Sequence, residues 1–245
     1  MRQLKPAASM IEKDQFLNNG FITIDNIYTS EEVDKIINQI KQANTDKDTF
    51  RKSSDLFAIR QFLKEVPSTL SIILNDNLKK ILTELFSKNY FAVKSIYFDK
   101  PASSNWYVSY HQDLTISVDK KVELPGFSFW TVKQNQFAVQ PPTEILQNIV
   151  TVRIHLDNTD EENGALKVIP GSHLKSIYRP ESTNWTTESV VSCNVLKGGI
   201  MLMKPLLLHS SGRTTNKKQR RVIHIEFSNM ELPEGLNWSE KIYLN

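Results

Sequence analysis

The chain has 245 residues, of which 40% are hydrophobic and 23% are charged, as is typical of a globular protein with a large core. Thirty basic residues against 27 acidic ones leave a formal charge of +3, which argues against nucleic acid or a membrane surface as a partner. The single cysteine, Cys193, excludes an internal disulfide and is typical of a reducing cytoplasm. The sequence contains no apolar run of about 18 residues, and residues 1–10 do not resemble a signal peptide.

The first part of the chain is predicted to be mainly helical. Residues 14–18 predict a short helix that ends at Gly20 and is followed by a strand over residues 21–24. Thr29 and Glu32 have the spacing of a capping box, which opens an amphipathic helix with apolar residues at helical spacing. The same spacing predicts a second helical region over residues 69–85.

From Tyr90 onward the pattern changes to short strands bounded by Pro, Gly and Asn. Strands are expected over residues 91–98, 149–156, 164–169, 190–195 and 200–203. This number of short strands predicts a mainly β protein with flanking helices, in which N-terminal helices buttress a double-stranded β-helix, the cupin-like jelly roll. A single domain is expected over residues 1–245, with a helical part at about 10–89 and a jelly-roll core at about 90–230.

A long span at about residues 122–143 interrupts the strand pattern and is rich in aromatic residues. Loops of this length inside a compact domain are usually functional or disordered, and the aromatic residues argue against disorder. The span is therefore predicted to be a lid over the functional site. The alternative is an elaborated edge of the barrel that packs on itself.

A histidine and an aspartate one residue apart, His111 and Asp113, form the first candidate metal-binding pair. Along a strand, residues i and i+2 point to the same face, so the two side chains can bind one ion. His209 follows an apolar, strand-like run over residues 200–208 and supplies a third ligand. Two imidazoles and one carboxylate hold non-haem Fe(II) with open coordination positions. His111, Asp113 and His209 are therefore the candidate metal ligands and catalytic residues.

Arg220 follows His209 by 11 residues, in a second strand-like run. A hairpin over residues 210–216 would return its guanidinium to the metal. This combination suits 2-oxoglutarate, because the keto acid end chelates iron and the far carboxylate pairs with an arginine. The adjacent Arg221 should point to the opposite face, and it takes the role of Arg220 only if the register is shifted by one residue.

Four segments resemble the phytanoyl-CoA dioxygenase family of Fe(II)/2-oxoglutarate oxygenases, and within it a short bacterial subgroup. They cover residues 14–25, 98–115, 152–173 and 198–227, and include Tyr-His-Gln-Asp at 110–113, Asn-Gly-Ala-Leu at 163–166 and Pro-Gly-Ser-His at 170–173. The resemblance implies Fe(II), 2-oxoglutarate and O₂ as cofactors and cosubstrates. It also implies hydroxylation of a small-molecule substrate with release of succinate and CO₂. Related halogenases lack the carboxylate ligand, so the presence of Asp113 favours hydroxylation.

The resemblance also assigns residues around the metal. Ser211 matches a position whose hydroxyl helps Arg220 to hold the cosubstrate. Arg153 replaces a Trp that contacts the cosubstrate in the acyl-CoA-acting relatives, which makes a long-chain acyl-CoA substrate doubtful and places a cation near the pocket. Arg153 is a candidate cosubstrate-binding residue, and the alternative is that it faces an anionic substrate. Arg60, Trp130 and Lys133 are candidate substrate residues, and several cations there would favour an anionic substrate. The alternative for Arg60 and Lys133 is a role in solubility or in structural ion pairs.

Two other functions compete with this interpretation. A non-catalytic jelly roll could bind a metal or a small anion, but closed structural zinc sites have four protein ligands, whereas three are found here. An iron dioxygenase that does not use 2-oxoglutarate would leave Arg220 without a role. Of the remaining histidines, His155 and His224 either line the cavity or are hydrogen-bonded core residues, and His173 is expected to cap local backbone.

Overall fold

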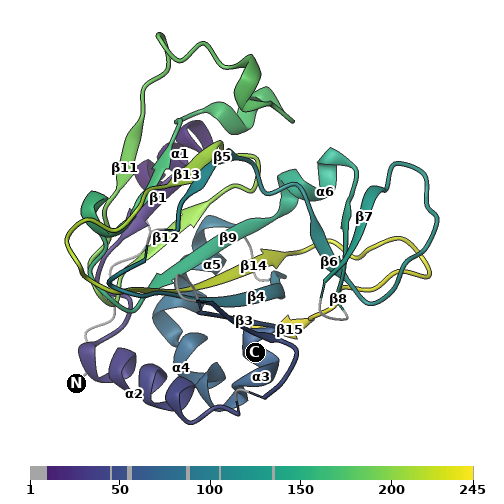
Figure 1. Ribbon diagram of the computed structural model, residues 1–245. Helices are drawn as coiled ribbons and strands as arrows, with labels where there is room; N and C mark the ends of the chain where they lie inside the picture. The colour runs from purple at the N-terminus through teal and green to yellow at the C-terminus, as the bar shows by residue number, and fades with distance from the viewer. Residues whose placement is uncertain are drawn as a thin grey trace.

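A computed structural model describes residues 10–44, 46–53, 57–86, 89–104, 106–133 and 136–244, with only the backbone of Ile11 and Lys133. The described chain forms three antiparallel sheets with helices packed outside them (Figure 1). The fold is mainly β with flanking helices, as predicted. No helix in the described ranges combines the length and the apolar character that crossing a bilayer requires.

The largest sheet has eight strands in the order β1-β12-β9-β14-β4-β3-β2, with β15 also paired to β4. Its strands are β1 (Phe21–Ile24), β2 (Phe50–Lys52), β3 (Phe57–Arg60), β4 (Phe91–Lys100), β9 (Val150–His155), β12 (Ile200–Met203), β14 (Arg220–Ser228) and β15 (Ile242–Tyr243). Three of these strands come from the N-terminal part of the chain, which is therefore not purely helical. We call this sheet the main sheet.

A second sheet of four strands faces the main sheet. Its order is β11-β10-β13-β5, from β11 (Val191–Cys193), β10 (Leu166–Val168), β13 (His209–Ser211) and β5 (Val108–His111). We call it the minor sheet. An apolar cluster that includes Leu166, Val168, Met201, Met203 and Leu207 packs between the two sheets.

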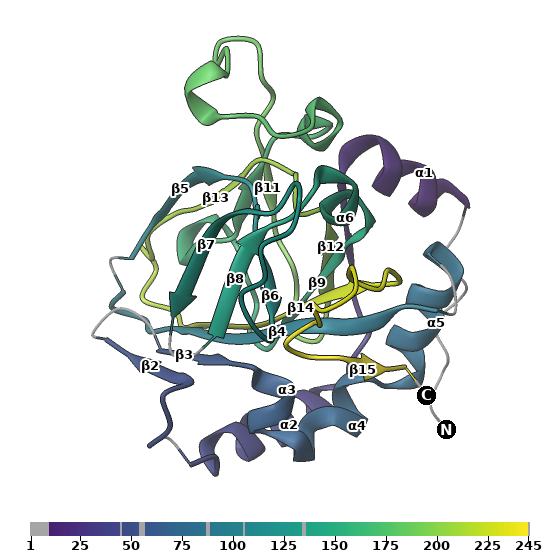
Figure 2. The same cartoon turned by 90° about the vertical axis from the view of Figure 1, so that its right-hand side faces the viewer.

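The span at 122–143 is largely a β-hairpin rather than an irregular loop. Strands β7 (Ser128–Lys133) and β8 (Gln136–Gln140) pair with each other, and β8 also pairs with β6 (Ile116–Val118) (Figure 2). Phe127, Trp130 and Phe137 pack against a hydrophobic cluster under this third sheet. The aromatic residues of the span therefore build a small core of their own.

Helices cover the outer face of the main sheet. They are α1 (Met10–Asn19), α2 (Ser30–Lys41), α3 (Phe62–Glu65), α4 (Leu70–Ile73) and α5 (Asp76–Leu85), with α6 (Thr143–Asn148) beside the third sheet. The capping box that opens α2 is present, because Thr29 accepts a hydrogen bond from the Glu32 amide and Glu32 accepts one from the Thr29 amide. Apolar side chains of α2 and α5 join those of β9 and β14 in the largest core cluster.

The helical region expected over residues 69–85 is interrupted. A short 3₁₀ turn (Pro67–Thr69) leads into α4, which ends at Ile73, and α5 begins after Asn75. The Asn75 side chain accepts a hydrogen bond from the Leu78 amide at 2.9 Å, which is the contact of an N-cap. The capping residue thus starts a new helix in the middle of a continuous apolar pattern. Three further 3₁₀ turns, at Glu161–Asn163, Ser172–Lys175 and Pro180–Ser182, lie in the connections of the minor sheet.

Candidate active site

Three side chains meet at one point, two from the minor sheet and one from the loop that follows β5. His111 is the last residue of β5, and His209, the first residue of β13, is its cross-strand partner. The Asp113 carboxylate lies 3.9 Å from His111 Nε2 and 3.8 Å from His209 Nε2. One ligand atom from each of the three residues lies within 4.8 Å of the others, so the three residues form a candidate metal site.

Backbone carbonyls orient both imidazoles in the same way. His111 Nδ1 lies 2.8 Å from the Ser109 carbonyl oxygen, and His209 Nδ1 lies 2.8 Å from the Leu207 carbonyl oxygen. A carbonyl only accepts hydrogen bonds, so each Nδ1 carries the proton and each Nε2 keeps its lone pair. Both lone pairs are therefore available at the atoms nearest Asp113. Such a hydrogen bond from the second nitrogen is the usual support of a metal-binding histidine.

Asp113 does not lie on a strand, although the spacing of His111 and Asp113 suggested a strand pair. Strand β5 ends at His111, and the Asp113 amide donates to the Pro205 carbonyl at 2.9 Å. Gln112 between them is buried and donates to the carbonyl of Leu206 at 2.6 Å. These bonds tie the loop to the turn that precedes His209. Gln112 was not predicted as a site residue, and its anchoring role has no signal in the local sequence.

The charges around Asp113 favour its ionised form. Burial would raise the pKa of Asp113, but nearby positive charge, on His209 and His224 when these are protonated and on Lys94, outweighs burial and holds the pKa well below its ordinary value. Burial also lowers the pKa of His209 to about 4. An ionised carboxylate beside a neutral, buried imidazole is the state in which both groups bind a cation.

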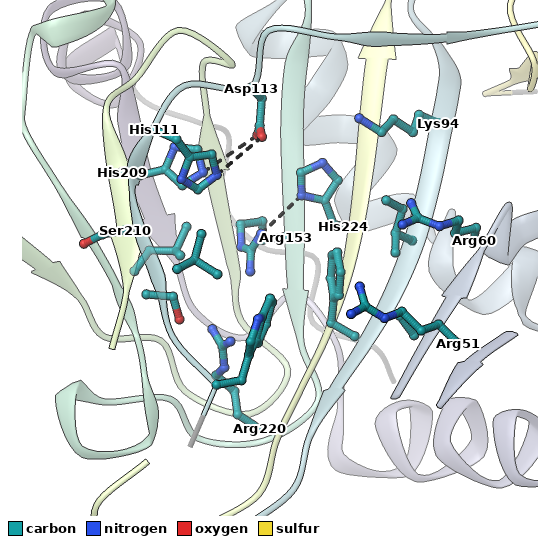
Figure 3. A pocket seen from close by; sticks show the side chains of 17 residues that line it. Arg51, Arg60, Lys94, His111, Asp113, Arg153, His209, Ser210, Arg220 and His224 are labelled. Atoms are coloured by element: carbon teal, nitrogen blue, oxygen red, sulfur yellow. Dashed lines mark hydrogen bonds and ion pairs between the residues drawn. The ribbon is translucent and has the colours of Figure 1, made fainter. Parts of the chain in front are cut away.

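A cavity of about 280 Å³ opens beside the three residues (Figure 3). Its basic lining residues are Arg51, Arg60, Lys94, Arg153 and Arg220, whereas Asp113 is the sole carboxylate among its described lining residues. Apolar side chains from both sheets complete the wall, among them Ile96, Phe98, Trp106, Val108 and Leu166. The cavity is therefore strongly positive and is suited to anionic ligands.

Arg220 and Arg153 form the buried cationic wall of this cavity. Arg220 is 4% exposed and Arg153 is 7% exposed. Within the described chain, Arg220 Nε and Nη1 and Arg153 Nε have no hydrogen-bond partner. Burial and the adjacent Arg153 lower the pKa of Arg220 to about 9. Buried guanidinium groups with free donors are costly without an anion, so these two residues mark an anion-binding position.

Arg220 reaches the site by a route other than the predicted hairpin. His209 is on β13 in the minor sheet, whereas Arg220 is on β14 in the main sheet, and the two strands do not pair with each other. The connection between them crosses from one sheet to the other. The hairpin prediction was wrong because the local sequence does not specify which sheet the second strand joins.

The neighbouring Arg221 points away from the cavity, as strand alternation requires. Its guanidinium pairs with Asp157, with Nη2 at 2.6 Å from Oδ1 and Nε at 2.9 Å from Oδ2. Ser211 is buried and lines the cavity, and its hydroxyl donates to the Gly164 carbonyl at 3.1 Å. The structure therefore brings Ser211, Arg153 and Arg220 to one cavity with the candidate metal site.

The predicted substrate residues fall in different places. Arg60 lines the cavity from β3. Trp130 is not among the described lining residues and packs under the third sheet instead. The side chain of Lys133 lies outside the described residues. His155 is hydrogen-bonded to Thr159 Oγ1 at 2.8 Å. His173 Nε2 lies 3.0 Å from the Leu17 carbonyl oxygen in α1, so His173 contacts backbone that is distant in sequence rather than the local backbone that was predicted.

A series of hydrogen bonds and one ion pair links polar side chains of the cavity wall on three neighbouring strands of the main sheet, β9, β14 and β4. His224 Nδ1 lies 3.2 Å from Arg153 Nη1, and its Nε2 lies 3.2 Å from Glu226 Oε1. Lys94 Nζ lies 2.7 Å from the same oxygen of Glu226. An arginine always donates, so His224 Nδ1 accepts and its Nε2 donates to the carboxylate. His224 therefore holds Arg153 in place. Lys94 and Glu226 were not predicted, although Lys94, Ile96 and Phe98 alternate along one predicted strand.

Known proteins share both the sequence pattern and the fold. The family model of phytanoyl-CoA dioxygenase (PhyH) matches residues 16–222. A probable alpha-ketoglutarate-dependent hypophosphite dioxygenase from Stutzerimonas stutzeri is 23% identical over 182 residues, which cover 68% of this chain and 54% of that protein. The chain thus spans about half the length of this curated relative.

Two solved structures illustrate the similarity of fold. EctD from S. alaskensis with 2-oxoglutarate and 5-hydroxyectoine has a TM-score of 0.70 at 18% identity, over 93% of this chain and 78% of that chain. HygX from Streptomyces hygroscopicus with nickel, 2-oxoglutarate and hygromycin B has a TM-score of 0.64 at 14% identity, over 90% and 87% of the two chains. These similarities confirm the predicted jelly-roll class.

Proposed function

We propose that this chain, which belongs to the phytanoyl-CoA dioxygenase (PhyH) family, is an Fe(II)- and 2-oxoglutarate-dependent dioxygenase that hydroxylates a small molecule. The observation that carries the proposal is the meeting of two kinds of site in one cavity. A set of two histidines and one carboxylate lies beside buried arginines with free donors. A metal site alone would also suit an iron dioxygenase that does not use 2-oxoglutarate, and an anion site alone would also suit a non-catalytic binding protein.

The donor set fits iron. His111 and His209 would bind it through Nε2, and Asp113 would bind it through a carboxylate oxygen. Three protein ligands from one side leave coordination positions open for the cosubstrate and O₂. A closed structural zinc site would need a fourth protein ligand, and the described residues place no fourth histidine, cysteine or acidic side chain in this cluster.

The arginines fit the two carboxylates of 2-oxoglutarate. Arg220 would hold the C5 carboxylate at the end of the cavity away from the metal. The Ser211 hydroxyl, which also lines the cavity, would assist by turning its proton from the Gly164 carbonyl to the carboxylate. Arg153 lies near enough to Asp113 for their charges to interact, so it is placed to contact the C1 carboxylate. His224 would keep the Arg153 guanidinium in that position. An iron dioxygenase without 2-oxoglutarate would leave this buried cationic wall without a ligand.

The protein's own contribution to the reaction is to bind, orient and exclude water. When bound, iron and 2-oxoglutarate supply the oxidising chemistry, in which one oxygen atom of O₂ enters succinate and the other enters the hydroxylated product, with loss of CO₂. Phe98, Trp106 and Leu166 line the cavity and reduce its water content. Asp113 stays ionised through the electrostatics described above and retains the metal.

The substrate is proposed to be a small molecule that carries negative charge, because the cavity is basic beyond its two cosubstrate arginines. The hypophosphite named for the Stutzerimonas relative is also a small anion, which is consistent with this class. A cytoplasmic location is proposed from the single, buried Cys193.

Anaerobic titration of the Fe(II)-loaded protein with 2-oxoglutarate tests the proposal. A metal-to-ligand charge-transfer band should appear in the wild type and weaken sharply in Arg220→Ala. A non-catalytic binding protein would consume no O₂ when air is admitted. An oxygenase of another type would consume O₂ at a rate independent of 2-oxoglutarate and would form no succinate.

A further inference from the structure

We infer that Arg51 and Arg60 form a second anion-binding position at the mouth of the cavity, which holds a carboxylate, phosphonate or phosphate group of the substrate. The identification of this anion as part of a substrate rests on the proposed function. The anion site itself is argued from the geometry of the main sheet. Neither residue belongs to the cosubstrate wall described above.

The strand register places the two arginines on one face. Arg51 on β2 lies directly opposite Ala58 on β3, and Arg60 follows Ala58 by two residues. Residues opposite each other, and residues two apart, share a face of a sheet. All three side chains line the cavity. Arg51 and Arg60 therefore form a diagonal cross-strand pair, for which Cα atoms are typically about 7–8 Å apart.

Ala58 leaves open space between the two guanidinium groups. Alanine has the smallest side chain of any residue except glycine, so the space above Ala58 is not filled by its own side chain. A diagonal pair of long cationic side chains with a small residue between them can close around one oxyanion from two sides. Figure 3 shows both guanidinium groups directed from the same wall toward the interior of the cavity.

The electrostatics of the pair favour an anion. Burial lowers the pKa of Arg60, and the nearby charge of Arg51 lowers it further. Two guanidinium groups that repel each other gain from a shared anion, because each then interacts with an opposite charge. Lys94, the next cation along the wall, pairs with Glu226 at 2.7 Å. We call the pair of Arg51 and Arg60 the fork, and we place the negative charge of the substrate there because both side chains line the cavity from one face of the sheet.

This position is separate from the cosubstrate position. A row of cross-strand partners runs from Arg60 through Ile96 and His224 to Arg153, on β3, β4, β14 and β9. Adjacent strands lie about 4.7–4.9 Å apart, so the backbones of Arg60 and Arg153 are separated by roughly 14 Å. One small dicarboxylate held by Arg153 and Arg220 would therefore not occupy the fork.

The surface beside the fork is apolar, and His224 follows it next to Arg153. Ile96 and Phe98 face the cavity between Arg60 and the buried arginines. A substrate with one oxyanion group in the fork and a short apolar body over these residues would present that body toward His111, Asp113 and His209. The inferred substrate class is therefore a small organic acid whose reactive C–H bond lies away from its charged group.

Isothermal titration calorimetry with small anionic and neutral probes tests the fork by measuring binding affinity, independently of enzyme turnover. Benzoate and phenylphosphonate carry an oxyanion on an apolar body, and benzyl alcohol is their neutral counterpart. The titrations use the full chain, both metal-free and anaerobically loaded with Fe(II) and 2-oxoglutarate. We expect both anions to bind the loaded protein and benzyl alcohol to bind at least tenfold more weakly. The stronger of the two anions indicates whether the fork suits a planar or a tetrahedral group.

The variants are chosen to separate the fork from general charge. Arg60→Met should weaken anion binding roughly 10- to 100-fold, the range expected for loss of charge-assisted hydrogen bonds. Arg51 is exposed, so Arg51→Met should have a smaller effect in the same direction. Lys52→Met removes the same charge from the adjacent position of β2, which faces the other side of the strand, and should leave affinity unchanged. Arg60→Lys should restore part of the affinity, and circular dichroism checks the fold of each variant.

The outcomes distinguish the two proposals. Equal anion affinity in wild type and in Arg60→Met would overturn the fork, as would binding that is lost only in Arg220→Met. Loss of anion binding in Arg60→Met, in a protein that gives no charge-transfer band with 2-oxoglutarate, would support the fork and overturn the proposed function. Preference for benzyl alcohol over both anions would also overturn the fork.

Discussion

His209 lies directly opposite His111 across the β13–β5 pair, and their ring centroids are 4.3 Å apart. The two imidazoles come from strands whose sequence positions are far apart. A metal ion bound by both would therefore cross-link the edge strand β5 to its neighbour β13. Ligand binding that requires the folded arrangement stabilises the folded state by mass action.

The first prediction concerns the carboxylate of this site. Asp113→Ala should abolish hydroxylation and iron binding but preserve the fold, because the Asp113 side chain is partly exposed and does not belong to an apolar core cluster. Iron content and the rise in Tm on adding Fe(II) measure the effect. Equal iron affinity and full succinate production in the variant would contradict the assignment of Asp113 as a ligand.

The second prediction compares two adjacent arginines. Arg220→Ala should raise the apparent KM for 2-oxoglutarate far more than Arg221→Ala does. Truncation of one partner of a buried charged pair costs on the order of 2–5 kcal/mol, which corresponds to roughly 30-fold to several thousand-fold. Arg221→Ala instead removes the pair with Asp157 and should mainly lower Tm. Exchange of the two phenotypes would mean that Arg221 binds the cosubstrate.

The third prediction concerns the ion pair behind the cavity. Lys94 and Glu226 side chains are 16% and 2% exposed, so Lys94→Met leaves a buried carboxylate without its strongest partner. Loss of one partner of a buried pair typically costs about 3–5 kcal/mol of unfolding free energy. The double variant Lys94→Met/Glu226→Gln should recover much of this loss. Additive effects in the double-mutant cycle, measured by urea unfolding, would show that the pair is not coupled.

The fourth prediction follows from the protonation of Cys193. Burial raises the pKa of Cys193 to about 12, so the folded protein keeps the neutral thiol at pH 8. The thiolate is the reactive form, and an unfolded cysteine has a pKa of about 8.5. Iodoacetamide at pH 8 should therefore label the protein in urea but not in native buffer. Rapid labelling of the native protein would show that Cys193 is exposed.

Features that depend on neighbouring residues could be predicted from the sequence. Thr29 and Glu32 are three residues apart, and their mutual hydrogen bonds require no information from elsewhere in the chain. The strand expected over residues 200–203 is present with the same bounds, because a short apolar run with a following proline indicates a buried strand. The family resemblance was confirmed by the PhyH match, and it rests on motifs in several strands.

Features that depend on sheet assignment could not be predicted. The run before His209 divides into β12 in the main sheet and a turn before β13 in the minor sheet, although its residues are apolar apart from Lys204. Arg51 offers no local signal, since its place in the cavity follows from the pairing of β2 with β3. Trp130, a predicted substrate residue in an aromatic-rich span, packs against the hydrophobic cluster of the third sheet, and the pairing of that sheet is not visible in the sequence.

The crossing of the chain between His209 and Arg220 has a consequence for cosubstrate selectivity. Because the two residues belong to opposite sheets, the span between them is determined by the thickness of the layer that separates the sheets. Changes of length in residues 212–219 should leave that span unaltered. Leu166, Met201 and Met203 fill the layer, so their side-chain volumes should set the distance between the sheets. That distance in turn should set the length of dicarboxylic acid that fits between the metal site and Arg220. Discrimination between five-carbon and six-carbon keto acids is then a property of the protein's core rather than of its loops.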